Sequence, residues 1–207
     1  MVLNLKKSLW IIFSVLLVDQ ALKFYIKLTM TVGEKVPVIK HFFYLYFTEN
    51  IGMAYGMQFG GDWGKLFLSI FRILAVIALG IFLVYIIKHK RSNGLIFCVS
   101  LILAGALGNI IDSAFYGMIF SSSTFYSVAQ LVAPGHGYAP FLHGKVVDML
   151  YFPIIDVSRA AAPSWIPNFL FGPDGRLIFF RPIFNVSDSA ITIGIFWWFL
   201  FQRNSSK

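Results

Sequence analysis

Charged residues and cysteine are both scarce in this sequence of 207 residues. Asp, Glu, Lys and Arg make up only 13% of the chain, whereas hydrophobic residues make up 58%. Soluble domains contain about a quarter charged residues, so this composition excludes an ordinary soluble enzyme and a disordered chain. The single cysteine, Cys98, excludes an internal disulfide and a zinc cluster of cysteines. Most of the apolar surface is therefore expected to face lipid.

Long apolar stretches account for most of the chain. Four of them have the length that a membrane-spanning helix needs, at about 8–28, 66–87, 95–116 and 185–201. No signal-peptide cleavage site follows the first stretch, so we expect it to be retained. The sequence therefore predicts an all-α integral membrane protein, a single membrane domain over 1–207 with four transmembrane helices.

The basic residues set the expected orientation. With four spans, both termini and the connection between spans two and three share one side of the membrane. That side has no Asp or Glu and carries the basic residues Lys6, Lys7, Lys88, Lys90, Arg91, Arg203 and Lys207. Such a side is cytoplasmic by the positive-inside rule. The net charge of +8 is then a topology signal, and no nucleic-acid partner is expected.

Two segments remain outside the membrane, 29–65 and the long outer loop 117–184. Each contains runs of β-branched and aromatic residues typical of strands. These runs lie at 36–39, 42–47, 146–152 and 176–181, whereas 121–123 and 160–167 resemble loops. We therefore expect a small extracytoplasmic β element beside the four helices.

Polar residues interrupt the apolar stretches at one membrane boundary, the outer one. They form four groups: Asp19 with Lys23, Asn109 with Asp112 after Gly105 and Gly108, Asp148 alone, and Asn185 with Asp188. Each group has a structural explanation: an ion pair that eases insertion, polar contacts between helices, an exposed strand face, and a helix cap. Their shared depth favours a single polar site, because ionisable residues in a membrane mark function by default.

The chemistry open to such a site is limited by missing motifs. The sequence has no HExxH zinc motif and no Gly-x-Ser-x-Gly elbow, and His136 and His143 lack a ligand pattern. Two aspartates held together share one proton, so that one activates water while the other protonates a carbonyl oxygen. That chemistry is aspartic peptide hydrolysis, and it requires no metal and no cofactor.

Five segments in order resemble the lipoprotein signal peptidase (signal peptidase II) family, bacterial aspartic proteases of the inner membrane. They are Asp19-Gln-Ala-Leu-Lys23, Asn50-Ile-Gly-Met-Ala-Tyr55, Gly105-Ala-Leu-Gly-Asn-Ile-Ile-Asp112, Gly144-Lys-Val-Val-Asp148 and Phe184-Asn-Val-Ser-Asp-Ser-Ala-Ile191. The resemblance implies that Asp148 and Asp188 are the catalytic pair. It also implies substrate-binding or site-shaping roles for Asp19, Lys23, Asn50, Gly52, Ala54, Gly108, Asn109, Asp112 and Asn185.

The resemblance further implies a substrate and a location. The substrate is a prolipoprotein whose cysteine carries diacylglycerol, and cleavage falls just before that cysteine. The active site lies at the outer face of the inner membrane, next to membrane lipid, in a protein expected to be a monomer. The alternative from another class is a small transporter or channel subunit, which also carries intramembrane acidic residues. The cytoplasmic halves of spans two and three are mainly apolar, which disfavours a polar path through the membrane.

The chain departs from the family pattern at three points. Ser113 stands where the family commonly has Arg, and Arg159, Arg176 or Arg181 are candidates to replace it. Ser187 stands where Ala is usual, and we expect it to add a hydrogen bond near Asp188. The chain is also long in 118–143 and 153–181, and we hypothesise that these loops cover the site as a lid or grip the substrate.

Overall fold

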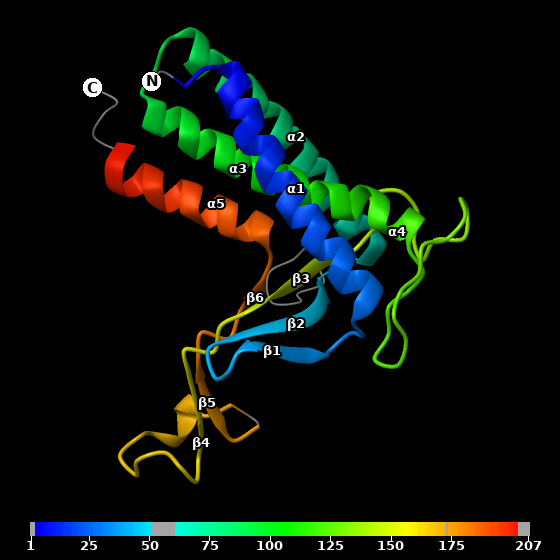
Figure 1. Ribbon diagram of the computed structural model, residues 1–207, viewed down its shortest axis with the longest axis vertical. Helices are drawn as coiled ribbons and strands as arrows, with labels where there is room; N and C mark the ends of the chain where they lie inside the picture. The colour runs from blue at the N-terminus through cyan, green and yellow to red at the C-terminus, as the bar shows by residue number, and fades with distance from the viewer. Residues whose placement is uncertain (1–2, 51–60, 173, 203–207) are drawn as a thin grey trace.

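Four long helices form the body of the protein in the computed structural model (Figure 1), which describes residues 3–50, 61–172 and 174–202. They are α1 (Leu5–Thr29), α2 (Gly61–Lys88), α3 (Asn93–Ile111) and α5 (Val186–Trp197). A π-helical turn, η2 (Asp112–Tyr116), and the short α4 (Gly117–Ile119) extend α3, while η4 (Trp198–Gln202) extends α5. The stretches that the sequence predicted as spans are therefore helical, with ends that differ by a few residues.

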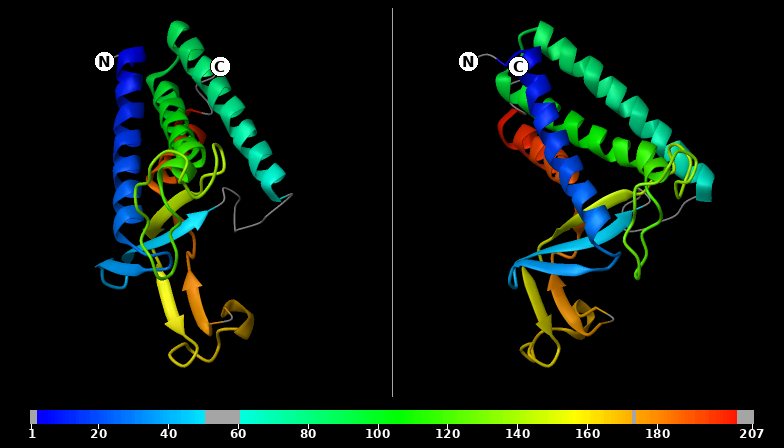
Figure 2. Two further views of the ribbon diagram at one scale, coloured as in Figure 1. Left: turned by 90° about the vertical axis from the view of Figure 1, so that its right-hand side faces the viewer. Right: turned by 45° about the vertical axis from the view of Figure 1, so that its right-hand side comes forward.

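Three of these helices are long and apolar enough to cross a membrane: Leu5–Thr29, Trp63–Lys88 and Asn93–Ile119. The fourth, Val186–Phe201, is apolar but shorter. The start of α1, the connection between α2 and α3, and the end of α5 lie at the same end of the bundle (Figures 1 and 2). This is the arrangement that four alternating spans produce. The protein is a mostly helical membrane protein.

Helix α3 is the centre of the bundle, because α1, α2 and α5 all pack against it. Glycines allow the closest of these approaches. A Cβ atom on Gly105 would lie 2.2 Å from the carbonyl oxygen of Ser187, and one on Gly194 would lie 2.9 Å from that of Cys98. Small residues let helix backbones come together in membranes. The pairing of α3 with α5 therefore fixes where the first turn of α5 begins.

We expect Gly105→Ala to lower the melting temperature in detergent, because its Cβ meets α5 backbone rather than a movable side chain. Overpacking of this kind costs about 1–3 kcal/mol. The matched control is Gly80→Ala in α2, where an added Cβ has nothing within 4 Å. Removing backbone freedom there should leave stability unchanged or raise it by about 0.4–1 kcal/mol. Equal melting temperatures for the two variants would contradict the close α3–α5 contact.

A four-stranded antiparallel sheet lies against the end of the bundle opposite the α2–α3 connection (Figure 1). Its strand order is β1 (Lys35–Ile39), β2 (Phe43–Asn50), β3 (Val146–Tyr151) and β6 (Ile183–Phe184). A buried cluster that includes Ile26, Phe47, Tyr116, Phe120 and Met149 joins this sheet to α1 and α3. The predicted β element is therefore present and fixed to the helix ends.

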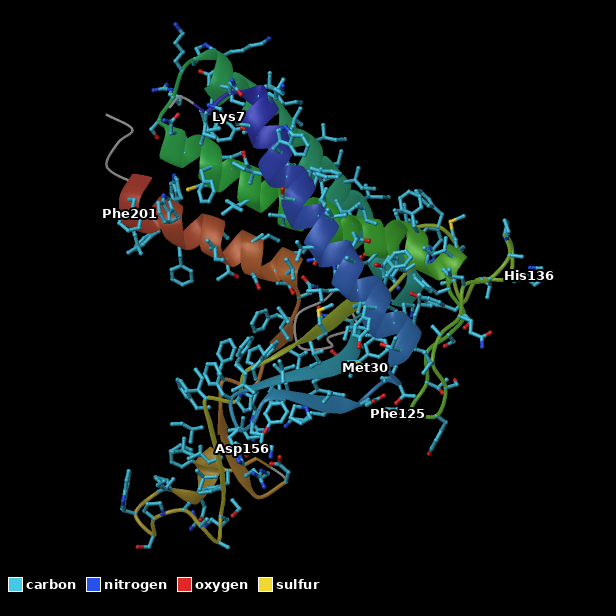
Figure 3. All side chains as sticks on the ribbon, in the orientation of Figure 1. Lys7, Met30, Phe125, His136, Asp156 and Phe201 are labelled. Carbon is cyan, nitrogen blue, oxygen red and sulfur yellow. The ribbon has the colours of Figure 1, made fainter. Side chains whose placement is uncertain are left out.

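A second unit, the β4–β5 unit, is formed by the long outer loop. Strands β4 (Ile155–Ser158) and β5 (Arg176–Phe179) pair only with each other, and the 3₁₀ turn η3 (Asn168–Leu170) lies between them. The single β element expected from the sequence is thus two sheets. The unit projects from the side of the main sheet that faces away from the helices, as the position of Asp156 shows (Figure 3).

Candidate active site

The site lies where the first turn of α5 meets strand β3. Asn185 precedes α5, and its side chain accepts a hydrogen bond of 2.8 Å from the backbone N–H of Asp188. This cap places the Asp188 carboxyl beside the helix start, where it is half-buried. Asp148 lies in the middle of β3 and is only 5% exposed. The exposed strand face considered for Asp148 is therefore wrong, whereas Asn185 does cap its helix.

Two asparagine amides connect the two carboxyl groups. Asn109 Nδ2 donates to Asp188 Oδ1 at 2.8 Å, and Asn185 Nδ2 donates to Asp148 Oδ1 at 2.7 Å. The two amides also meet, because Asn185 Nδ2 lies 3.1 Å from Asn109 Oδ1. A chain of hydrogen bonds from α3, β3 and α5 thus holds both aspartates in one network. Asn50 of β2 adds a side-chain hydrogen bond to Asp148.

Lys23 is the buried centre of a second group of charges. Its Nζ lies 2.9 Å from Asp19, 2.8 Å from Asp112 and 3.1 Å from the Asn109 side-chain oxygen, and none of the three charged side chains is exposed. Burying a charge is costly unless it is paired and hydrogen-bonded. Here all three ammonium protons have acceptors. The sequence predicted an ion pair of Asp19 with Lys23 within α1, and the structure extends it to a triad with Asp112 that joins α1 to η2.

Each carboxylate of the triad also holds the backbone directly before one of the two site aspartates. Asp112 Oδ2 accepts from the N–H of Val147 at 3.2 Å, and Val147 precedes Asp148. Asp19 Oδ1 accepts from the N–H of Ser187 at 2.9 Å, and Ser187 precedes Asp188. The triad is therefore the support that fixes both carboxyl groups relative to each other.

Gln20 is a member of this network that the sequence reasoning did not single out. Its Nε2 donates to Asp112 Oδ1 at 2.9 Å, and its Oε1 accepts from the Tyr116 hydroxyl at 3.1 Å. Gly108 belongs to the same contact, since a Cβ there would lie 2.0 Å from Ser187 Oγ and 2.8 Å from Asp19 Oδ2. The signal for Gln20 was its position within the segment from Asp19 to Lys23.

Burial and the neighbouring carboxylate act in the same direction on Asp148. Burial, followed by the charge of Asp188, raises the pKa of Asp148 to about 7. Hydrogen bonds from Asn185 and Asn50 oppose this shift. Perturbed carboxyl groups that face a second carboxyl are typical of acid–base sites. The pair can therefore hold one proton near neutral pH, as paired aspartates do.

A third buried ion pair fixes the edge of the site where β2 ends. Glu49 contacts Lys27 of α1, and its other oxygen lies 2.9 Å from Lys145, just before β3. Although burial alone would raise it, the charge of Lys27 and the hydrogen bonds of both lysines lower the pKa of Glu49. Lys27 also donates to Ser123 at 2.9 Å. The loop after α4 is thereby attached to the last turn of α1.

The residues expected to join the site are mostly brought together. The networks above connect nine of them: Asp19, Lys23, Asn50, Gly108, Asn109, Asp112, Asn185, Asp148 and Asp188. Gly52 and Ala54 lie outside the described residues. Within the described parts of the chain, no group of three or more His, Cys, Asp or Glu side chains is arranged to hold a metal ion.

Two expectations about departures from the family pattern are not met. Arg159, Arg176 and Arg181 lie in or beside the β4–β5 unit and bind partners there: Ile166 O, Asp156 and Asp174 respectively. They are therefore not replacements for the missing Arg at Ser113, whose hydroxyl donates to Asn109 O at 3.0 Å. Ser187 Oγ is buried with no hydrogen-bond partner among the described residues, so it adds no bond near Asp188.

One cation near the two aspartates comes from an unexpected place, helix α2. Arg72 is half-buried, and its charge interacts with Asp188 and Asp148. In the sequence, Arg72 is the one charged residue of the apolar stretch 66–87. An arginine in such a span is itself the signal, because insertion of a charged side chain costs about 2.5–3.5 kcal/mol.

Helices hold an acidic pair beside a small sheet in this protein, and a membrane enzyme of known structure shares its fold. The fold resembles a bacterial membrane enzyme structure determined by the in meso method, with a TM-score of 0.61 and 28% identity over 98% of this chain and 96% of the other. The family model described as signal peptidase (SPase) II matches residues 11–202. The chain therefore belongs to the signal peptidase II family.

Curated relatives carry the same family name. A lipoprotein signal peptidase of Porphyromonas gingivalis is 46% identical over 182 residues, which cover 87% of this chain and 75% of that protein. Those of Amoebophilus asiaticus and Staphylococcus carnosus are 33% and 30% identical and each cover 91% of this chain. The protein is thus a bacterial-type membrane protease whose family membership supports cleavage of signal peptides from prolipoproteins.

Proposed function

We propose that the protein is an aspartic endopeptidase in which Asp148 and Asp188 are the catalytic dyad. The observation that carries this proposal is the hydrogen-bonded chain from Asp148 through Asn185 and Asn109 to Asp188. Two carboxyl groups held in one network by neutral amide donors can share a proton. No metal and no cofactor is needed for the hydrolysis that such a dyad performs.

The proposed reaction assigns one role to each carboxyl. The carboxylate takes a proton from a water molecule, which attacks the scissile carbonyl carbon. The protonated carboxyl donates its proton to the carbonyl oxygen, so that a neutral tetrahedral intermediate forms. Asp148, whose pKa lies near 7, holds the shared proton at rest. Collapse of the intermediate breaks the C–N bond: one of its hydroxyl protons passes to the carboxylate of the dyad, and the leaving amine takes the proton of the other carboxyl, so that the dyad again holds one proton.

The proposed substrate is a prolipoprotein whose cysteine carries diacylglycerol, cut just before that cysteine. The site lies at the helix ends beside the sheet, where a signal peptide in the membrane and a lipid anchored at its surface can both reach it. We propose that all four helices cross the bacterial inner membrane as a single domain with the termini in the cytoplasm. The active site then faces outward, next to membrane lipid, in a monomer.

The test is cleavage of a purified diacylglyceryl-modified prolipoprotein by the purified protein in detergent, followed as a gel shift. We expect cleavage to persist with EDTA present and to fail on the same prolipoprotein without its lipid. Loss of cleavage on adding EDTA would contradict a metal-free dyad. An intact lipidated substrate would contradict the peptidase assignment, and transport by reconstituted protein would then be measured.

A further inference from the structure

Arg72 is the one charged residue between Leu66 and Ile87 in helix α2. The proposed dyad makes no use of it in the mechanism above. An arginine placed in a membrane-spanning helix is costly, and it is retained where it faces a polar site or another charge. Its surroundings therefore indicate what it does.

The face of α2 that carries Arg72 is fixed by two hydrogen bonds. Lys65 Nζ donates to the carbonyl oxygen of His143, and Ser69 Oγ donates to that of Leu142 at 3.1 Å. Residues four and seven positions after Lys65 lie on the same helix face. Arg72 is therefore directed at the segment that leads into β3, one turn further into the bundle than Ser69.

The direction in which the Arg72 side chain leans brings its guanidinium nearer to the two aspartates. Side chains on a helix lean toward its N-terminus. The N-terminus of α2 lies at the end of the bundle where the sheet is attached (Figure 2). The long Arg72 side chain therefore extends from α2 toward the site, and its charge interacts with Asp188 of α5 and with Asp148 of β3.

Groups from α1 and η2 also lie near the dyad. Lys23 of α1 acts on Asp148, but its ammonium group is held between Asp19 and Asp112. From η2, Ser113 supplies a hydroxyl that donates to Asn109 O rather than a charge. Arg72 is a cation directed at the dyad from the α2 side, on the same helix face as Lys65 and Ser69.

We propose that Arg72 is a substrate-positioning residue, whose guanidinium binds the main-chain carbonyl of the peptide beside the scissile bond and favours the singly ionised dyad. The inference rests on the proposed function. A guanidinium presents several N–H donors in a rigid fork, which suits an extended peptide that crosses two carboxyl groups. The same charge, lying beside both aspartates, lowers the pH at which the dyad loses its shared proton.

The experiment compares Arg72→Gln, Arg72→Lys and wild type on a diacylglyceryl-modified prolipoprotein across pH. We expect Arg72→Gln to raise KM by ~10- to 100-fold, as loss of charge-assisted hydrogen bonds does. The alkaline limb of its kcat/KM profile should move to higher pH. Arg72→Lys should restore the wild-type limb, because the charge returns, but not the KM, because the fork does not. The matched control, Arg91→Gln at an exposed position in the connection between α2 and α3, should behave as wild type.

Several outcomes would overturn the inference. A purely structural role would lower the melting temperature and kcat of Arg72→Gln while KM and the alkaline limb stay as in wild type. If Arg72→Gln cannot be purified folded, Arg72→Lys decides, and a wild-type KM for that variant contradicts binding by the fork. A wild type that leaves the substrate intact contradicts the proposed function, and the inference with it. Active wild type with unaffected Arg72 variants contradicts the inference alone.

Discussion

Asp148→Asn and Asp188→Asn should each reduce kcat for the lipidated prolipoprotein by ~10³-fold or more, because acid–base catalysis by one group contributes up to about 10⁴ and the second group cannot act alone. Asparagine keeps the size of the side chain and its hydrogen bonding to Asn185 or Asn109, but it cannot exchange the shared proton. The measurement is the single-turnover cleavage rate, with the melting temperature of each variant recorded beside it.

The matched control for these variants is Glu34→Gln, an exposed carboxylate just before β1 that accepts a hydrogen bond from the N–H of Thr31. It should cleave at the wild-type rate. Should either site variant cleave at the wild-type rate, that aspartate is not catalytic, and Asp112 or Asp19 becomes the next candidate.

Wild-type activity itself should decline above about pH 7. Asp148, with its raised pKa, keeps the shared proton of the two aspartates below that pH and releases it above.

Lys23→Met should destabilise the protein by about 3–5 kcal/mol, because it leaves two buried carboxylates without their cation. Asp19 and Asp112 would repel each other and release the N–H groups of Ser187 and Val147 that they now hold. We therefore expect both a lower melting temperature in detergent and a loss of cleavage in the fraction that stays folded. Circular dichroism during heating, with cleavage assays below the transition, measures the two effects.

Two further variants test the origin of this loss. Lys6→Met makes the same substitution on the same helix at an exposed position, and it should change stability by no more than about 0.5 kcal/mol. Adding Asp112→Asn to Lys23→Met removes one of the uncompensated charges and should recover part of the melting temperature. If the double variant is less stable than Lys23→Met, charge repulsion is not the cause.

The sequence was a good guide to the helices and to which polar residues meet. Asp19 and Lys23 were expected on one face of the first helix, and Asn109 and Asp112 on one face of the third. In the structure these two faces meet, because Asp19, Asp112 and Asn109 all contact Lys23 Nζ. The apolar stretches marked the helices because lipid accepts few charges over about 20 residues. Strand positions followed from β-branched and aromatic runs near 42–47 and 146–152.

What the sequence could not provide is partner choice across the fold. The run at 176–181 reads as a strand, but its composition does not say that it pairs with β4 rather than with the main sheet. Arg159, Arg176 and Arg181 were candidates to replace the missing Arg at Ser113, whereas the β4–β5 unit carries them away from the helices (Figure 3). Arg72 is distant in sequence from both aspartates, and only the packing of α2 against α3 brings it near them.

The lid hypothesis for 118–143 and 153–181 remains a prediction, now divided between two segments. The first is attached to α1 through Ser123 and Lys27 and packs Gly137 against the backbone of Gly117 and Met118. The second forms the β4–β5 unit, whose aromatic contact with the main sheet runs through Phe180 and Phe184. Since Phe184 directly precedes Asn185, this unit is joined to the first turn of α5 by a short connection.

The triad around Lys23 has a consequence for the newly made chain. Its members and the two backbone N–H groups that it holds come from α1, η2, β3 and α5, the first and the last helices among them. A chain whose helices have entered the membrane but have not yet packed has two separate aspartates rather than a dyad. Under the proposed mechanism, synthesis must therefore reach α5 before any peptide can be cut, and an incomplete copy is inactive.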